Sequence, residues 1–485
     1  MLQFLKQQAN RTFTENDAVT NITTGSDCLD LFATIGALRN ETEATAITRF
    51  DRAWAENPDL AIKTLFFARD IRGGLGERKI FRTLLRHMAT NMPVAVQKNL
   101  WAVAAFGRYD DLLVLLDSPL RKNVVAYIKA QLDMDSKAIE DDGAVSLLGK
   151  WLPSVNAHNK DTIRYGKMLA KALDMTEAEY RRMLTKLRDR IAIVENSLRN
   201  KDYSFEYEKQ PSKAMMKYRK AFLRNDADRY KGFLEQVANG KASMNTDALY
   251  PYDVIRPILS GPVPVDERRI LDVTWNALED FTRGENALAV IDGSGSMYGY
   301  GNPTPAEVAL SLGVYFAEHS KGMFANHFIT FSGKPRLVKI KGKAIYEKIK
   351  YCMGFNEVSN TNVKKVFDLI LSTAVKHNLP QSELPSTLYI ISDMEFDVCA
   401  KNAGMTNFEY AKKAFEAHGY KLPTVVFWNV QSRNEQQPVK LNEQGVVLVS
   451  GANSRVFSMI QSGNLSPMAF MLGTLNNERY EKIQA

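Results

Sequence analysis

The stretch Ala287-Leu-Ala-Val-Ile-Asp-Gly-Ser-Gly-Ser-Met297 determines the fold that we predict for the second half of the chain. It begins with an apolar run, as in a strand buried on both faces of a parallel sheet. A carboxylate, Asp292, follows the run, and two hydroxyls, Ser294 and Ser296, come next between glycines. The glycines allow a tight turn, so the three side chains can direct oxygens at one point. Such hard oxygen ligands suit Mg²⁺ or Mn²⁺.

A second apolar strand that ends in a carboxylate lies downstream. Residues 388–392 are followed by Asp393, and Thr361 lies just before the amphipathic run 363–377. Neighbouring parallel strands bring their carboxyl ends to one edge of a sheet, where ligands bind. The structural alternative is an ordinary Gly/Ser turn after a buried strand. We expect a site for Mg²⁺ or Mn²⁺ made of Asp292, Ser294, Ser296, Thr361 and Asp393.

From residue 284 onward, strands alternate with helices. This alternation indicates a doubly wound, mostly parallel sheet with helices on both faces. The strand at 336–340 closely follows the turn at 332–335, so we expect one antiparallel edge strand. The predicted strands are 287–291, 326–331, 336–340, 387–392, 424–429 and 445–450, and the predicted helices are 305–319, 344–352, 363–377, 407–418 and a final pair near 455–475.

Residues 1–283 show helical periodicity and no β-type alternation of any length. Apolar stripes at helical spacing are broken by short glycine turns at 69–74 and 107–110. Helix, turn and helix in succession are typical of a helical-repeat solenoid. We therefore predict a multi-domain protein of the α + α/β class, with an all-α, HEAT-like repeat domain over 1–283 and an α/β domain over 284–485.

The composition is that of a soluble globular protein. No apolar run of the 485-residue chain approaches the roughly 20 residues that cross a bilayer. The N-terminus has no basic segment followed by an apolar one, so we expect no signal peptide. Cys28, Cys352 and Cys399 lie far apart, without metal-site spacing, and we expect buried thiols. These features favour a cytoplasmic protein that does not bind membranes.

The positive charge is concentrated in one segment. Residues 181–231 hold 15 Lys and Arg against 7 Asp and Glu, a surplus equal to the net charge of +8 of the whole chain. Lys and Arg alternate there with aromatic residues, which together offer phosphate contacts and stacking planes for nucleic acid. The alternative is a solvated helix face whose aromatic residues belong to the core. The candidates for RNA contacts in this segment are Arg181, Arg182, Lys186, Lys217, Arg219, Lys220 and Arg224.

The five predicted ligands resemble the metal-ion-dependent adhesion site of von Willebrand factor A domains, in which Asp-x-Ser-x-Ser, a Thr and an Asp hold one divalent cation. A helical N-terminal region followed by such a domain resembles the Ro ribonucleoprotein (TROVE-type) family. The segments 69–79, Lys150-Trp-Leu-Pro-Ser154 and 290–297 look like an uncharacterised branch of Ro-like proteins. A longer linker around 135–160 distinguishes this chain from plain Ro proteins.

The resemblance implies a basic ring of helical repeats that binds small structured or misfolded RNA. Two of these segments supply further candidates, which are Arg69, Arg72, Arg78, Lys79 and Lys150. Two structural alternatives stay open. Residues 69–74 could be a helix C-cap glycine turn in which an Asp–Arg pair holds two helices together, and Trp151 could belong to a packed helix start.

The chain is poorly equipped for catalysis. It has no HExxH spacing, no GxxxxGK[ST] phosphate loop and no Gly-x-Ser-x-Gly elbow. Two carboxylates and three hydroxyls leave a cation incompletely coordinated, so the acidic side chain of a protein partner can complete its shell. We expect an RNA-binding protein without enzymatic activity. The alternative is a metal-dependent protein–protein adaptor that does not bind RNA.

Overall fold

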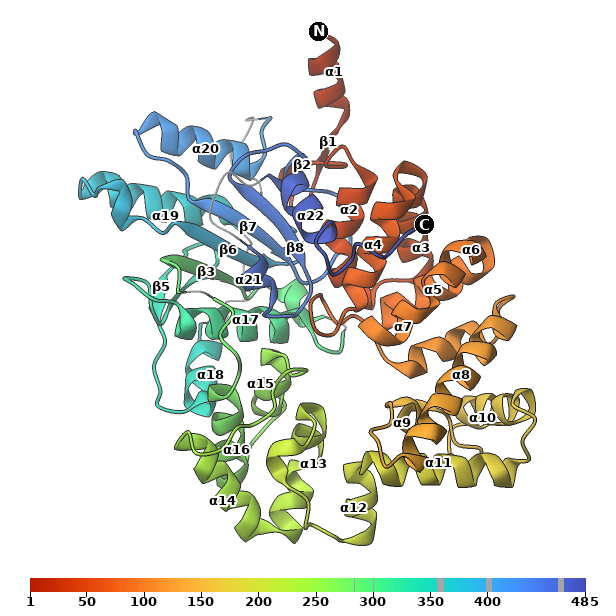
Figure 1. The fold of residues 1–485 in the computed structure, drawn as a ribbon. Helices are drawn as coiled ribbons and strands as arrows, with labels where there is room; N and C mark the ends of the chain where they lie inside the picture. The colour runs from red at the N-terminus through yellow and green to blue at the C-terminus, as the bar shows by residue number, and fades with distance from the viewer. Residues whose placement is uncertain (283, 300, 356–361, 398–403, 461–465) are drawn as a thin grey trace.

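The computed structural model describes residues 1–282, 284–299, 301–355, 362–397, 404–460 and 466–485. Within these ranges, no helix is both long and apolar enough to span a lipid bilayer. The first part of the chain is helical, and the last part builds a six-stranded sheet flanked by helices. Figure 1 shows the helices from α8 to α16 extending away from the sheet.

Side-chain caps explain where many of the N-terminal helices begin. Ser26, Thr42, Asn57, Asn159 and Thr176 each accept an N–H from the third residue after them. Two 3₁₀ segments, η1 (Ile35–Asn40) and η2 (Tyr109–Leu115), connect helices. The helices of this region are α1 (Leu2–Ala9), α2 (Asp27–Thr34), α3 (Glu43–Glu56), α4 (Pro58–Arg69), α5 (Lys79–Asn91), α6 (Pro93–Lys98), α7 (Leu100–Phe106), α8 (Arg121–Glu140), α9 (Leu148–Trp151), α10 (Lys160–Ala172), α11 (Glu177–Ile191), α12 (Val194–Asn200), α13 (Ser212–Asn225), α14 (Ala227–Ala238), α15 (Pro251–Leu259) and α16 (Val265–Asn276).

The sheet has the strand order β5-β4-β3-β6-β7-β8. All neighbouring pairs are parallel except β4 and β5, which pair antiparallel at one edge. This confirms the predicted parallel sheet and its antiparallel edge strand. The strands are β3 (Ala287–Asp292), β4 (His327–Phe331), β5 (Leu337–Lys339), β6 (Thr387–Ser392), β7 (Thr424–Asn429) and β8 (Val446–Ser450).

Helices cover both faces of the sheet. The residues of β3 are all buried, and they alternate between two clusters of apolar side chains. Ala289 and Ile291 face the cluster that contains α17, whereas Leu288 and Val290 face α19 and α20. The helices of this region are α17 (Pro305–His319), α18 (Ile345–Met353), α19 (Val363–Lys376), α20 (Asn407–Ala417), α21 (Val456–Met459) and α22 (Pro467–Leu475).

The sequence predicts helices throughout the N-terminal region, but the structure contains two short strands there. Strands β1 (Arg11–Phe13) and β2 (Val19–Asn21) form a short antiparallel hairpin. Asn21 bridges to Gln437, far away in the sequence, and Thr14 Oγ1 donates to the carbonyl of Phe396 at 2.6 Å. These distant contacts support strands that are too short to be recognised by their periodicity.

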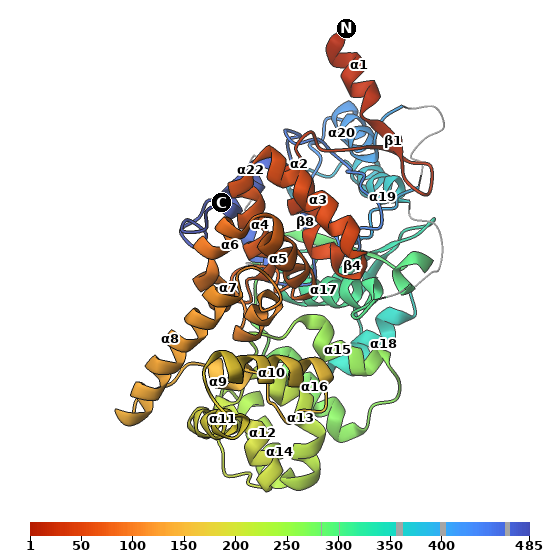
Figure 2. The ribbon, with the colours of Figure 1, turned by 90° about the vertical axis from the view of Figure 1, so that its right-hand side faces the viewer.

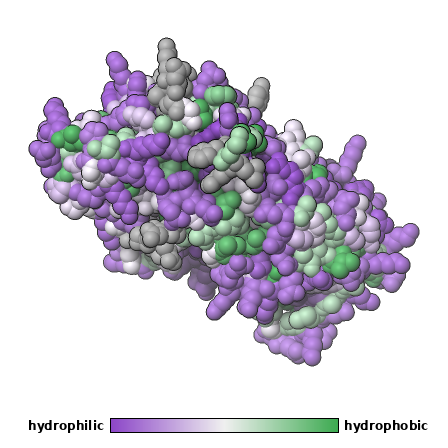
Figure 3. Space-filling view, turned by 90° about the horizontal axis from the view of Figure 1, so that it is seen from above, coloured by the Kyte–Doolittle hydropathy of each residue, from purple (hydrophilic) through white to green (hydrophobic). Residues whose placement is uncertain are grey.

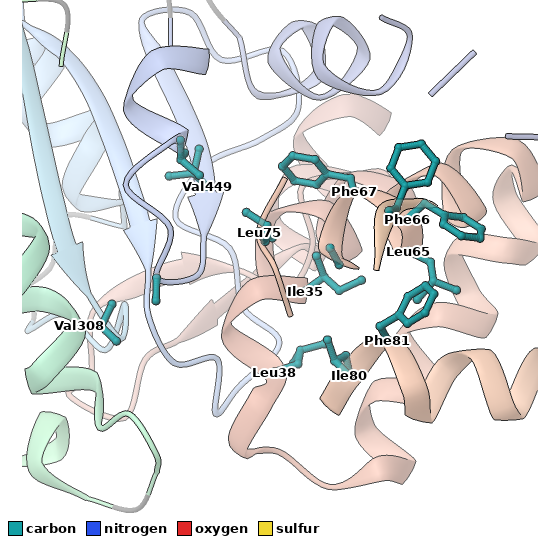
Figure 4. Close-up of a cluster of buried hydrophobic side chains, with 14 of the residues drawn as sticks. Ile35, Leu38, Leu65, Phe66, Phe67, Leu75, Ile80, Phe81, Val308 and Val449 are labelled. Carbon is teal, nitrogen blue, oxygen red and sulfur yellow. The ribbon is translucent and has the colours of Figure 1, made fainter. Parts of the chain in front are cut away.

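One hydrophobic core runs through both predicted domains, from Cys28 to Ile483. Helix α22 packs on α2, α4 and β8. In Figure 4, Phe67 and Leu75 lie on the side of the N-terminal helices that faces Val449 of β8. The boundary at 283/284 stays a prediction, and the core crosses it.

The helices from α8 to α16 extend away from the sheet, and α8 to α11, α15 and α16 still contribute to this core, whereas α12, α14 and most of α13 pack in a separate cluster. Figures 1 and 2 show them below the sheet, with α15 and α16 coming back beside α17 and α18, where α15 packs on both α17 and α18. The face in Figure 3 is mainly hydrophilic, with hydrophobic residues in small groups. The helices therefore bend around a space between the N-terminal helices and α13 to α15, and side chains from both sides line that space.

Candidate functional site

The predicted cation ligands lie at the carboxyl edge of the sheet. Asp292 ends β3, and Asp393 follows β6, its parallel neighbour. The next strands, β4 and β7, lie on opposite sides of this pair, so the strand order reverses between β3 and β6. Open α/β sheets bind ligands at such a switch point. We call Asp292, Ser294, Ser296 and Asp393 the edge site.

Hydrogen bonds hold Asp292 at this edge. Its Oδ1 accepts the backbone N–H of Ser294 at 2.9 Å, and its Oδ2 accepts the hydroxyl of Ser392 at 2.6 Å. The hydroxyls of Ser294 and Ser296 lie 3.1 Å apart, at the start of the short 3₁₀ segment η4 (Gly295–Tyr298). The tight turn therefore places the two hydroxyls of the DGSGS sequence next to each other and beside the carboxylate.

Asp292 is a carboxylate whose negative charge is disfavoured. Burial, together with the nearby negative charge of Asp393, raises the pKa of Asp292 to about 7. Both residues are 2% exposed. A divalent cation between two such carboxylates would offset the charge that burial and mutual repulsion disfavour. The edge site therefore has the electrostatic character of a site for a cation.

Asp393 already has a positively charged partner. Arg433, in the segment after β7, donates from Nη2 to Asp393 Oδ2 at 3.0 Å, and its Nη1 lies 3.0 Å from Glu15 Oε2. The backbone N–H of Glu395 donates to Asp393 Oδ1 at 3.3 Å. The carboxylate of Asp393 thus connects the sheet edge to a residue of the N-terminal hairpin through one guanidinium.

The structure brings together Asp292, Ser294 and Ser296 and places Asp393 close enough to affect the pKa of Asp292. Thr361 lies outside the described residues. Across the part of the chain that the structure describes, no group of three or more His, Cys, Asp or Glu could hold a metal ion. The predicted site has only two carboxylates and relies on hydroxyls for its other ligands, so a group of that kind is not expected there.

A second candidate site is a cavity of about 880 Å³ between the N-terminal helices and α13 to α15. We call it the basic cavity. Its walls come from the ends of α4 and α9, from α11 to α13 and from the segment before α15. It is lined by eight Lys or Arg side chains but by only two acidic ones, Asp189 and Glu195. The basic residues are Arg69, Arg78, Arg108, Lys150, Arg188, Arg199, Lys213 and Lys217.

Half of these basic side chains have partners within the protein. Arg69 pairs with Asp111, Arg108 with Asp110, and Lys213 with Asp253. Arg188 donates to the carbonyls of Gly149 and Leu152 and to Ser154 Oγ, at 2.9–3.0 Å. Within the described ranges, the other four form no ion pair, and these are Arg78, Lys150, Arg199 and Lys217.

Of the four, Arg78 lies closest to other positive charges that affect its pKa. Burial lowers the pKa of Arg78, and the positive charges of Arg108 and Arg82 lower it further. Arg82 is engaged with both Asp110 and Asp111, so these carboxylates are shared among several cations. The positive charge of Arg78 is therefore incompletely balanced, and a phosphate could balance it.

The cavity also presents aromatic surface. Trp151 lines it and carries the guanidinium of Arg108 at 3.8 Å from its ring centroid. Tyr250 and Tyr252 stack with their centroids 5.5 Å apart, and Lys213 lies over Tyr250 at 4.8 Å. Cations beside aromatic rings are the usual surface for a nucleic acid strand.

Two further concavities continue the basic surface. One, of about 890 Å³, shares Arg188 and Arg199 with the basic cavity and is also lined by Arg181, Arg182 and Lys186. The other, of about 610 Å³, shares Lys213 and Lys217 and is also lined by Arg219 and Lys220. Most of the predicted basic residues of 181–231 therefore line one connected surface. Arg224 is exposed and lines none of the three concavities.

The segment 69–79 contributes fewer basic side chains to the basic cavity than the sequence suggested. Arg69 is 2% exposed and paired with Asp111. It therefore has the structural role given above as the alternative, in which an Asp–Arg pair holds two helices together. Arg72 is exposed, but it does not line the basic cavity, and Lys79 donates from Nζ to the carbonyl of Arg39 at 3.0 Å. Lys150 lies on the cavity wall, beside Trp151.

Comparison with known proteins places the chain in a family. Residues 14–134 and 118–288, together more than half of the chain, match the family described as a domain of unknown function, DUF2828. The chain belongs to the DUF2828 family. Residues 286–468 of this DUF2828 protein match a second domain of unknown function, DUF7788.

A relative of this DUF2828 protein is the uncharacterized protein L728 of Acanthamoeba polyphaga mimivirus. The two are 30% identical over 509 residues, which cover 96% of this chain and 87% of the viral protein. Among solved structures, the Deinococcus radiodurans RO (RSR) protein matches with 13% identity and a TM-score of 0.34, over 93% of each chain. A TM-score of this size is too low to support a conclusion about fold or function.

Several residues of the two sites in this DUF2828 protein carry no functional signal in the sequence. Arg108 lies in a glycine turn that predicts only a break between helices, and Tyr250 and Tyr252 lie outside the basic segment. Nothing near Arg433 or Glu15 in the sequence marks them as neighbours of the edge site. Their roles depend on contacts between distant segments, which local patterns do not encode.

Proposed function

We propose that this chain is a Ro-like RNA-binding protein. In this proposal the basic cavity and its two neighbouring concavities hold a structured or misfolded RNA, and the edge site holds a divalent cation that docks an acidic side chain of a protein partner. The chain acts by binding and not as an enzyme. Cys28 and Cys352 are buried free thiols, which supports the predicted cytoplasmic location.

The observation that carries the RNA proposal is the set of four cations without ion-pair partners in the basic cavity. Surface cations are normally solvated or paired, and a concave surface that gathers unpaired ones raises the local concentration of anions. Arg78 adds to this because two cations, Arg82 and Arg108, lie near it and compete for the same carboxylates, Asp110 and Asp111. The cavity therefore favours a ligand with several negative charges.

The extent of the basic surface favours a polyanion over a small anion. The three concavities share lining residues, so one flexible chain of phosphates could contact Lys186, Arg199, Lys217 and Lys220 in turn. Trp151 and Tyr252 supply surfaces on which bases can stack. Unpaired RNA segments expose both phosphates and base faces, as such a surface requires.

We further propose that the sheet is of the von Willebrand factor A type. The strand order, the antiparallel edge strand and the DGSGS turn at the switch point support this. Asp292, Ser294, Ser296 and Asp393 fit a hard cation such as Mg²⁺ or Mn²⁺, because they offer only oxygen ligands and two buried carboxylates. A bound ion would supply an open coordination position for the partner's carboxylate.

The protein–protein adaptor is the second candidate, because the edge site could dock a partner without any RNA. The two functions differ in their response to salt. Binding through phosphate contacts weakens steeply as salt rises. In a plot of the logarithm of the binding constant against the logarithm of the salt concentration, each contact with single-stranded nucleic acid adds about −0.7 to the slope. An adaptor would show little RNA affinity at any salt concentration.

The test is a fluorescence-polarisation titration of the full chain with a small structured RNA that has an unpaired tail, at several salt concentrations. Lys150→Glu, Arg199→Glu and Lys217→Glu are combined in one variant. Because three phosphate contacts become repulsive, we expect the affinity to fall by about a hundredfold and the salt slope to become shallower.

The matched control combines Lys350→Glu, Lys376→Glu and Lys413→Glu. These lysines are exposed on α18, α19 and α20, and the control changes the net charge by the same amount. We expect the control variant to bind RNA like the wild type. Equal losses in both variants, or no RNA binding by the wild type, would contradict the proposal and favour the adaptor.

A further inference from the structure

Arg433 lies where the predicted divalent cation would act. Its guanidinium contacts Oδ2 of Asp393, whose side chain is completely buried, and it is itself about 30% exposed. Its Nε is buried and makes no hydrogen bond to any described residue. The guanidinium therefore places a positive charge at the edge site, where the carboxylates of Asp393 and Glu15 hold it.

The second of these carboxylates belongs to the N-terminal hairpin. Glu15 Oε2 lies 3.0 Å from Arg433 Nη1, and the backbone N–H of Glu15 donates to Glu395 Oε2 at 2.9 Å. Asn16 Nδ2 donates to the carbonyl of Glu395 at 2.7 Å, and Thr14 Oγ1 donates to that of Phe396. Residues 14–16 therefore rest on the segment that directly follows Asp393.

The same segment is tied to the neighbourhood of Arg433. Glu395 Oε1 accepts from Asn434 Nδ2 at 2.9 Å and from Gln436 Nε2 at 2.7 Å. The N-terminal hairpin, the segment after β6 and the segment after β7 therefore form one polar network beside the edge site. A change in the position of Arg433 would alter contacts in all three.

We propose that Arg433 is a built-in counter-cation of the edge site, which a divalent cation displaces from Asp393 on binding. This rests on the proposed cation site. A divalent ion would use the same carboxylate and repel the guanidinium, because like charges at short range in a buried site interact unfavourably. Displacement of Arg433 from Asp393 weakens its ion pair with Glu15, which is one of the contacts that hold residues 14–16, so cation binding loosens these residues from the sheet edge.

The affinity of the edge site for a cation thus depends on Arg433, a residue that is not a ligand. Because Arg433 and the cation compete, removal of Arg433 strengthens cation binding, whereas removal of a ligand weakens it. The opposite signs separate a competing residue from a residue that merely supports the site. The coupling also works in reverse, so a stronger hold of Glu15 on Arg433 weakens cation binding.

The test is isothermal titration of the full-length chain with Mn²⁺. We expect Arg433→Gln to bind Mn²⁺ about tenfold more tightly than the wild type. Glu15→Gln should strengthen binding less, because it leaves Asp393 paired with Arg433. The matched control is Arg455→Gln, which removes a similarly exposed arginine paired with Glu279 and should not change the affinity.

A second measurement follows residues 11–21 by hydrogen exchange with and without Mg²⁺. In the wild type, Mg²⁺ should speed exchange in this segment, and in Arg433→Gln exchange should be fast without Mg²⁺. Equal Mn²⁺ affinity of the wild type and Arg433→Gln, or weaker binding by a folded Arg433→Gln, would overturn the competition while leaving the cation site intact. Binding of Mn²⁺ by neither protein would overturn the cation site together with it.

Discussion

The guanidinium of Arg69 donates from Nε to Oδ2 of Asp111 at 2.7 Å, and both side chains are almost completely buried. Oδ1 of the same carboxylate accepts from Arg82 Nε at 2.6 Å. Asp111 therefore connects the end of α4 with η2 and α5. The position that the sequence suggested for a phosphate contact is occupied by a buried ion pair at the edge of the basic cavity.

Replacement of Arg69 tests this structural role. Arg69→Met leaves Asp111 buried with one partner fewer, so the free energy of unfolding should fall by about 3–5 kcal/mol, as measured by urea denaturation. Arg72→Met changes an exposed side chain nearby and should cost less than about 0.5 kcal/mol. Similar losses for both variants would contradict the assigned role of the pair.

Glycine at position 74 is required by close packing. A Cβ there would lie 2.0 Å from the carbonyl oxygen of Phe67, which belongs to the backbone of α4 and cannot move easily. Gly74→Ala should therefore destabilise the protein by about 1–3 kcal/mol in thermal unfolding. Gly473→Ala, where a Cβ meets nothing within 4 Å in helix α22, should instead stabilise it by up to about 1 kcal/mol.

The raised pKa of Asp292 predicts a pH dependence of stability in the presence of a chelator. The folded protein binds a proton at Asp292 up to a pH of about 7, whereas the unfolded chain loses it near the ordinary value of 3.8. Stability should therefore fall as the pH rises between these values, by at most about 1.4 kcal/mol per pH unit, and level off above the folded pKa. Asp292→Asn should remove this component, as measured by denaturation at pH 5 and pH 7. The same slope in both proteins would argue against the shift.

Arg199 and Arg224 form a matched pair within the basic segment. Both are exposed, but Arg199 lines two of the three concavities, whereas Arg224 lines none. Arg199→Gln should weaken RNA binding several-fold and reduce the salt slope by about 0.7, the value for one lost contact with single-stranded RNA. Arg224→Gln should bind like the wild type. A larger effect of Arg224→Gln would place the RNA outside the basic cavity.

The sequence predicted the sheet well because each strand is a short apolar run with its own flanking signals. The run 287–291 and the turn after it were sufficient to place Asp292 at the carboxyl edge, and 387–392 did the same for Asp393. The hairpin of β1 and β2 was not predictable in this way, since its strands have three residues each and depend on Gln437 and Phe396.

The charged residues show the limit of reading function from sequence. A run of arginines and lysines predicts a basic surface, but it does not distinguish Arg199 from Arg188, which donates to carbonyls at the end of α9. The same limit applies to Arg69, whose partner Asp111 lies 42 residues away. Whether a cation is free for a ligand depends on the tertiary contacts that neutralise it.

The contact between Asp70 and the segment around residue 480 has a consequence for biosynthesis. Asp70 is fully buried and accepts hydrogen bonds from Arg479 Nη2 at 2.7 Å and from the Tyr480 hydroxyl at 2.9 Å, and the Tyr480 ring stacks on Phe106. During translation, α4 and α7 are made hundreds of residues before these partners. The packing of α4 and α7 against the segment around residue 480 can therefore form only after that segment has left the ribosome.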